Sequence, residues 1–197
     1  MIRVHEKSRK KQLPMFIAGV TFLGLIIFIA WLLIAFTGFI QAKEQLKKDT
    51  QTLQESITLQ KELLARILAE SVSYPVKEDD IQHGLKKVVK SVSATLEAEN
   101  LFIDSAAVTG LTRMLVVAER ESERFFSLHS LQGDDSLDRK IKMQQDSLRG
   151  YFLATKKTMQ DYNASVTQYN EVINRFPLAL LKYFLSYQER IPFPVGL

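Results

Sequence analysis

The sequence of 197 residues contains no cysteine, which excludes disulfide bonds, thiolate metal sites and cysteine nucleophiles. Other active-site motifs are missing too: there is no HExxH sequence, no glycine-rich phosphate loop and no G-x-S-x-G sequence. Asp80 and His83 have the three-residue spacing of metal-binding helical bundles, but such bundles need a second pair of this kind, and none occurs. We therefore predict no enzymatic activity, no cofactor and no metal site.

Charged residues are absent from a run of 26 residues, Met15–Ile40. As an α-helix this run would be about 39 Å long, against a bilayer hydrocarbon thickness of about 30 Å. A core helix of a soluble domain carries a polar stripe, and this run has none. The run also exceeds the apolar core of a signal peptide, about 7–15 residues, and no clear cleavage site follows it. We predict a single-pass transmembrane helix, with the lipid bilayer as its partner.

Excess positive charge is missing from the chain after this run. Residues 1–14 carry five basic residues and one acidic residue, which accounts for the whole net charge of +4. The neutral remainder is a poor match for nucleic acid, so we predict no nucleic-acid partner. Only Lys43, Lys47 and Lys48 closely follow the run, and the positive-inside rule then favours a cytoplasmic tail and an extracytoplasmic domain.

Alternation typical of β-strands is also absent, whereas helical periodicity is common after Ile40. Residues 41–73 lack glycine and proline, and an apolar seam indicates a helix that continues from the transmembrane helix until Pro75. The seam consists of Leu46, Thr50, Leu53, Ile57, Gln60, Leu64 and Ile67, widened by Leu59, Leu63 and Leu68.

A second helix is indicated from Ile81 to Leu96, and a third can begin at a cap formed by Asp104 or Ser105. Whether the two are separate stays open at this point. The positions expected to be buried in the third helix are Val108, Leu111, Leu115, Val116 or Val117, Phe125 and Leu128.

The most regular pattern follows a predicted loop at Gln132–Ser136 and extends from Ile141 to Phe176, before Pro177. Its stripe consists of Ile141, Gln145, Leu148, Phe152, Thr155, Met159, Tyr162, Val166, Tyr169, Ile173 and Phe176. Long helices with one apolar stripe each predict an all-α fold, in which a transmembrane helix precedes an antiparallel bundle of four-helix type. The expected organisation is a basic tail at 1–14, the transmembrane helix at 15–40, the bundle at 41–177 and an apolar, aromatic tail at 178–197. This last tail is too short to span a bilayer; it either packs back on the bundle or contacts a membrane surface or another subunit.

Three segments of the C-terminal half resemble sequences of the LemA family. The run DYNASVTQYNEVINRFP, residues 161–177, is similar to the family pattern Y-N-x-x-V-x-x-Y-N-x-x-I-x-x-F-P. Residues 111–117 followed by Glu119 resemble its L-x-R-L-L-x-V-x-E segment, and residues 187–193 resemble its Y/F-x-x-R-x-P-F ending. The matching signature residues are Arg113, Glu119, Tyr162, Asn163, Tyr169, Asn170, Phe176 and Pro177.

The resemblance implies a bacterial single-pass membrane protein with a bundle of long antiparallel helices and no established enzymatic activity. We therefore expect a location in the inner membrane and a structural, scaffolding or assembly role at the bacterial envelope. The alternative is a sensor whose bundle binds a small ligand or a partner and signals through the transmembrane helix.

The signature residues themselves suggest a structural role. Tyr162, Tyr169 and Phe176 lie on one seam and are expected to fill the core, while Asn163 and Asn170 can hydrogen-bond a neighbouring helix. We also expect a homo-oligomer, because polar residues at positions 50 and 60 of the seam resemble those that fix register between partner helices. Other membrane or envelope proteins are further possible partners.

Overall fold

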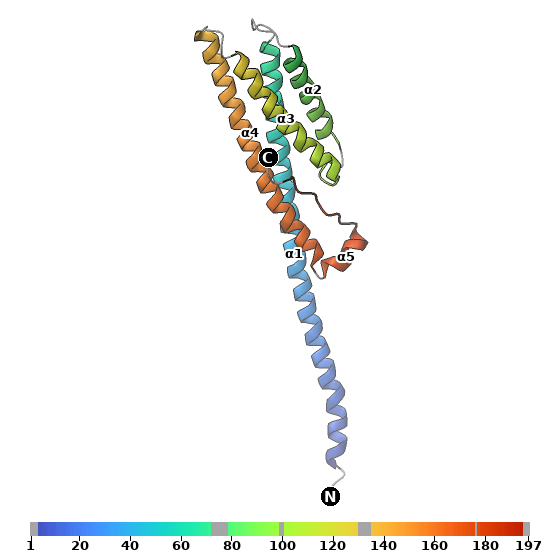
Figure 1. The fold of residues 1–197 in the computed structure, drawn as a ribbon. Coiled ribbons are helices and arrows are strands. Elements are labelled where there is room, and N and C mark those ends of the chain that lie inside the picture. The colour runs from blue at the N-terminus through green and yellow to red at the C-terminus, as the bar shows by residue number, and fades with distance from the viewer. Residues whose placement is uncertain (1–3, 72–78, 99–100, 130–134, 176, 195–197) are drawn as a thin grey trace.

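The computed structural model describes residues 4–71, 79–98, 101–129, 135–175 and 177–194, which form helices and no strand. The five helices are α1 (Val4–Ser71), α2 (Asp79–Leu96), α3 (Ser105–His129), α4 (Asp135–Asn174) and α5 (Leu178–Leu185) (Figure 1). The all-α prediction is confirmed.

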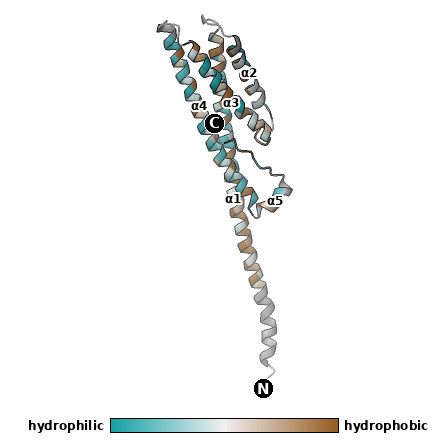
Figure 2. Cartoon of the chain, viewed as in Figure 1, coloured by the Kyte–Doolittle hydropathy of each residue, from teal (hydrophilic) through white to brown (hydrophobic). Residues whose placement is uncertain are grey.

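α1 is one unbroken helix of 68 residues that contains both the apolar run and the first helix of the bundle, as the sequence predicted (Figure 1). It is long and apolar enough to cross a membrane. Hydrophobic residues predominate just below the bundle (Figure 2), where Phe22 is 66% exposed and Ile34 is 72% exposed. Burial becomes nearly complete at Phe39 and Ala42, where α1 enters the bundle.

α1 and α4 run antiparallel side by side, as three polar contacts at successive levels indicate. Gln144 donates a hydrogen bond of 2.7 Å to Glu70, and the hydroxyls of Ser56 and Thr155 are 2.9 Å apart. Nearer the apolar run, the Ser165 hydroxyl donates to the Asp49 carboxylate. α2 and α3 pack together and cover only the distal part of this pair (Figure 1).

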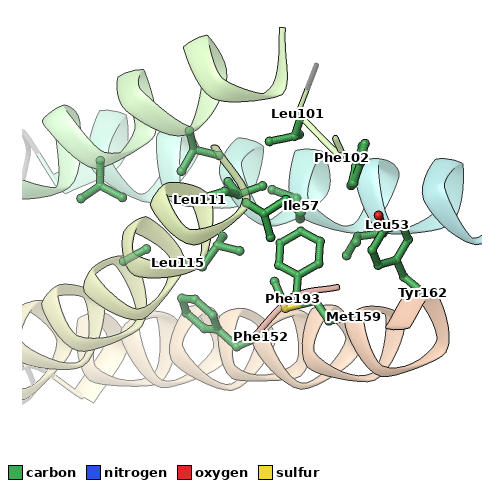
Figure 3. Close-up of a cluster of buried hydrophobic side chains, with 14 of the residues drawn as sticks. Leu53, Ile57, Leu101, Phe102, Leu111, Leu115, Phe152, Met159, Tyr162 and Phe193 are labelled. Carbon is green, nitrogen blue, oxygen red and sulfur yellow. The ribbon is translucent and has the colours of Figure 1, made fainter. Parts of the chain in front are cut away.

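The core is built mainly from the predicted helical stripes, and Leu101, Phe102 and Phe193, which lie outside the helices and were not predicted, complete it (Figure 3). Every described position of the α4 stripe is buried except Gln145, whose neighbour Gln144 is buried instead. The α1 seam is also turned inward, but Leu59, expected to widen it, is 48% exposed. Phe126 of α3 is 2% exposed and was not anticipated, because it lies beside the stripe that contains Phe125.

α2 and α3 are separate helices, which answers the question that the periodicity left open. α2 ends at Leu96 and α3 begins at Ser105. The Asp104 carboxylate accepts a hydrogen bond of 2.8 Å from the backbone N–H of Ala106, so Asp104 is the cap of α3. Most of the predicted loop at 132–136 lies outside the described residues, and α4 already includes Asp135.

The extended part of the C-terminal tail, residues 187–194, packs back on the bundle, as in the first of the two alternatives. α4 ends at Asn174, and α5 follows directly after Pro177. Ser186 has a left-handed backbone (φ 51°) that ends α5 and redirects the chain. Residues 187–194 then extend along α4, and Phe193 is 1% exposed in the core.

Candidate functional site

The signature residues of α4 lie where the helix meets this C-terminal segment. Tyr162 and Tyr169 are 0% and 6% exposed, and Asn163 and Asn170 are half-buried beside them. Phe176 lies outside the described residues, and Pro177 is buried just before α5.

Each asparagine binds the backbone of one residue in the extended segment through two hydrogen bonds. Asn170 donates to the Arg190 carbonyl at 2.9 Å and accepts from the Arg190 N–H at 3.0 Å. Asn163 makes the same pair with Phe193, at 2.9 Å and 2.7 Å. The side-chain amides thus replace the neighbouring strand that an extended chain ordinarily needs. We call Asn163, Asn170, Arg190 and Phe193 the asparagine clasp.

The heptad spacing of the two asparagines follows from helix and strand geometry. Seven helical residues rise about 10.5 Å, and three extended residues span about 10 Å. Two asparagines seven apart on a helix therefore match backbone groups three apart on an extended chain, as in the pairs 163–193 and 170–190. We expected these amides to bond a neighbouring helix, and that was wrong: their partner is the extended segment.

Aromatic side chains complete the attachment of this segment. The Tyr162 hydroxyl donates a hydrogen bond of 3.2 Å to the Ile191 carbonyl, and the Ile191 N–H donates to the Phe102 carbonyl at 3.2 Å. The Phe193 ring lies 5.6 Å from the Tyr162 ring and 6.3 Å from the Phe102 ring (Figure 3). Burial raises the pKa of the Tyr162 hydroxyl, with a smaller opposing effect of Arg190, so Tyr162 is a neutral donor.

The second signature tyrosine connects the site to the end of the apolar run. The Tyr169 ring lies 6.1 Å from the Phe39 ring, which in turn lies 4.5 Å from the Tyr187 ring. Burial also raises the pKa of Tyr169. Phe39 is therefore held between α4 and the first residues of the extended segment.

A polar cluster between α4 and α5 was missed by sequence reasoning. Lys182 of α5 forms an ion pair of 2.7 Å with Glu189 and donates to the Asn174 amide oxygen at 3.0 Å. Asn174 donates to Glu189 at 3.0 Å, and the hydrogen bond from Lys182 is the main cause of a lowered pKa of Glu189. The only signal in the sequence is a third asparagine four residues after Asn170.

The signature residues of α3 stand apart from the clasp. Glu119 pairs with Lys156 of α4 at 3.1 Å, so it joins two helices. Arg113 is exposed beside a surface groove of about 350 Å³ between α2 and α3. The groove is lined by Gly84, Lys87, Val88, Ser91, Arg113, Met114, Val117 and Glu121.

The interior is tightly packed by comparison. Two small voids between the helices, of about 10 and 20 Å³, have space for little more than one water each. Gln60 lines both and is 1% exposed, and neither atom of its amide has a hydrogen-bond partner in the described part of the protein. Among the side chains that the structure describes, no group of three His, Asp or Glu residues is placed to hold a metal ion.

Comparison with family models, curated proteins and solved structures found no match to this chain. The likeness to the LemA family therefore depends on three segments of the chain, residues 111–119, 161–177 and 187–193.

Proposed function

We propose that this protein is a divergent LemA-like membrane protein whose helical bundle has a scaffolding or assembly role at the bacterial cell envelope. The observation that carries the proposal is the unbroken helix α1, which leads from an exposed apolar run into the bundle core. A bundle attached in this way has a fixed orientation relative to its anchor, which suits a protein that positions others.

The chemistry of the signature supports a structural role. The clasp asparagines use their amide oxygen and nitrogen on backbone groups of the same chain, and the Tyr162 hydroxyl is bonded in the same way. Each amide retains one N–H and one lone pair, but both of its polar atoms are directed at the C-terminal segment. The signature thus serves to hold the C-terminal segment against the bundle.

We further propose a single-pass topology in the bacterial inner membrane, with an extracytoplasmic antiparallel four-helix bundle and self-association. The seam from Leu46 to Ile67 is used inside the monomer, where most of it is buried against the other helices. The polar seam residues therefore no longer support a contact along α1, and copies would meet through other surfaces.

The direct test is purification of tagged full-length protein from solubilised membranes, with mass measurement in detergent and identification of partners. We expect a mass above the monomer or specific envelope partners. A monodisperse monomer without partners would overturn the scaffolding role. Protein recovered only in the soluble fraction would overturn the anchorage as well.

The groove between α2 and α3 favours the sensor as a second candidate, because its volume lies in the range of small-molecule sites. A Cβ at Gly84 would meet no atom within 4 Å, so Gly84→Leu can fill the groove without a clash at its first carbon. A compound that co-purifies with the wild-type chain and is lost in Gly84→Leu would support a sensor. An unchanged compound, or none in either protein, contradicts it.

A further inference from the structure

We propose that α5 lies in the interfacial layer of the bilayer beside the anchor, so that the protein contacts lipid through a second element. This inference rests on the proposed membrane anchorage of α1. It commits the outer face of α5 to lipid headgroups and the first carbons of the acyl chains.

The level of α5 along α1 is fixed by aromatic contacts. α4 passes Phe39 at Tyr169, with the ring centroids 6.1 Å apart, and continues to Asn174. Because α4 is antiparallel to α1, its last five residues extend about 7.5 Å further along the apolar run. Leu32, Ala35 and Gly38 are accordingly half-buried, although they belong to that run. α5 begins at this level and projects sideways (Figure 1).

The apolar run is longer than the hydrocarbon layer by about 9 Å, or about six helical residues. If these extra residues are the ones nearest the bundle, residues 35–40 lie among the lipid headgroups. An interfacial helix lies at the same depth. The polar cluster of Asn174, Lys182 and Glu189 lies at the same level and suits a wet layer. This end of the run is where tyrosines such as Tyr187 are favoured.

The two sides of α5 differ as an interfacial helix requires. Its sequence LALLKYFL has one charged residue, Lys182, which is turned toward Glu189 and Asn174 of the bundle. Leu178 is 2% exposed, whereas Leu180, about 200° further round the helix, is 59% exposed. The outward face of α5 thus presents an apolar side chain, and the anchor itself has exposed apolar side chains at Ile34 and Ile40, on either side of Phe39 in the sequence.

Both ends of α5 are attached to the bundle, so its depth is set by the protein. Its start follows the end of α4, and its end turns back at Ser186, where the Tyr187 N–H bonds to the Lys182 carbonyl at 3.2 Å. The clasp then fixes the chain at Arg190 and Phe193. α5 is a short excursion from the bundle toward the anchor side, and the bilayer is the apolar phase present at that side.

The absence of cysteine permits a direct test with single cysteines in the full-length chain. Leu180→Cys, Ile26→Cys in the anchor and Leu153→Cys on α4 all replace exposed residues. Each variant is labelled with the polarity-sensitive fluorophore NBD and reconstituted into phosphatidylcholine–phosphatidylglycerol vesicles. Quenching by lipids with a nitroxide near the headgroup or deep in the chain is compared with quenching by aqueous iodide.

We expect the label at 180 to be quenched at least threefold more by the shallow nitroxide than the label at 153, and more than by the deep nitroxide. If 180 behaves like 153 while 26 is quenched by lipid, the inference is wrong and the anchorage stands. If 26 is not quenched by either lipid, the anchorage itself fails. A label at 180 shielded from lipid and iodide alike means that a second copy covers α5, which also overturns the inference. Unchanged helix content by circular dichroism checks that each variant is folded.

Discussion

At the scale of single residues, the clasp asparagines stabilise backbone groups that water reaches only in part. Removing the Asn163 side chain leaves the N–H and C=O of Phe193 without their partners, which are 2.7 Å and 2.9 Å away. We expect Asn163→Ala to lower the free energy of unfolding by about 1–3 kcal/mol. Denaturant unfolding of the full-length chain in detergent measures this, with Gln168→Ala, an exposed site on α4, as control.

The same substitution should also release the segment locally. Trypsin cleavage after Arg190, followed by intact mass, is expected to be faster in Asn163→Ala than in the control. Equal stability and equal cleavage rates in the two variants would mean that the clasp contributes nothing to attachment.

Burial of the Gln60 amide costs free energy, and no hydrogen bond within the described structure compensates for it. Its amide is 1% exposed and has no partner for either atom. Gln60→Met keeps the shape and removes the unpaired amide, so we expect an increase of about 1–2 kcal/mol in the free energy of unfolding. Gln51→Met, at an exposed position of α1, should change it little. A destabilised Gln60→Met would indicate that the amide has a partner in solution.

The buried hydroxyl of Tyr162 makes stability depend on alkaline pH. Its pKa is raised by burial above the ordinary value of about 10, so the folded state holds the proton more tightly than the unfolded state. The contribution of the protonated Tyr162 to the free energy of unfolding is complete below pH 10 and is lost as the pH rises above 10. Tyr162→Phe should lower stability at pH 7 by about 1 kcal/mol through the lost hydrogen bond to Ile191, and should flatten the decline above pH 10. Parallel curves for the two proteins would contradict this.

At the scale of elements, α4 contains a glycine that its packing does not require. Gly150 is exposed in the middle of the helix, and an added Cβ would meet no atom within 4 Å. We expect Gly150→Ala to raise the free energy of unfolding by about 0.5–1 kcal/mol, because alanine loses less entropy in a helix. Ala154→Gly, also exposed on α4, is the reciprocal control and should lower it by a similar amount. A Gly150→Ala variant of lower stability would show that the position has another constraint.

The helices were predictable because each has a long apolar stripe, from Leu46 to Ile67 in α1 and from Ile141 to Ile173 in α4. The clasp was not, although Asn163 and Asn170 were both singled out. Its second half is an extended segment of a few residues without periodicity, and only the folded chain brings Arg190 and Phe193 to α4. The seven-residue spacing of the asparagines predicts partners three residues apart only if the partner segment is already known to be extended.

At the scale of the whole molecule, α1 is unbroken, so the orientation of the proposed membrane anchor decides in which compartment the bundle lies. Arg9, Lys10 and Lys11 supply three of the five basic residues before the apolar run, against three that closely follow it. Changing these three residues to Gln leaves two against three, so the positive-inside rule predicts mixed or inverted insertion. Protease digestion of intact spheroplasts measures whether the bundle is accessible from outside.

We expect the wild-type bundle to be digested from outside and the triple variant to be protected in part. The control changes Lys86, Lys87 and Lys90 to Gln; all three are exposed on α2. This variant loses the same amount of charge far from the membrane, so its digestion should be unchanged. Full protection of the wild-type bundle before lysis would place it in the cytoplasm. In that case α5 would meet the inner leaflet, whose anionic lipids carry a negative surface potential, instead of the outer one.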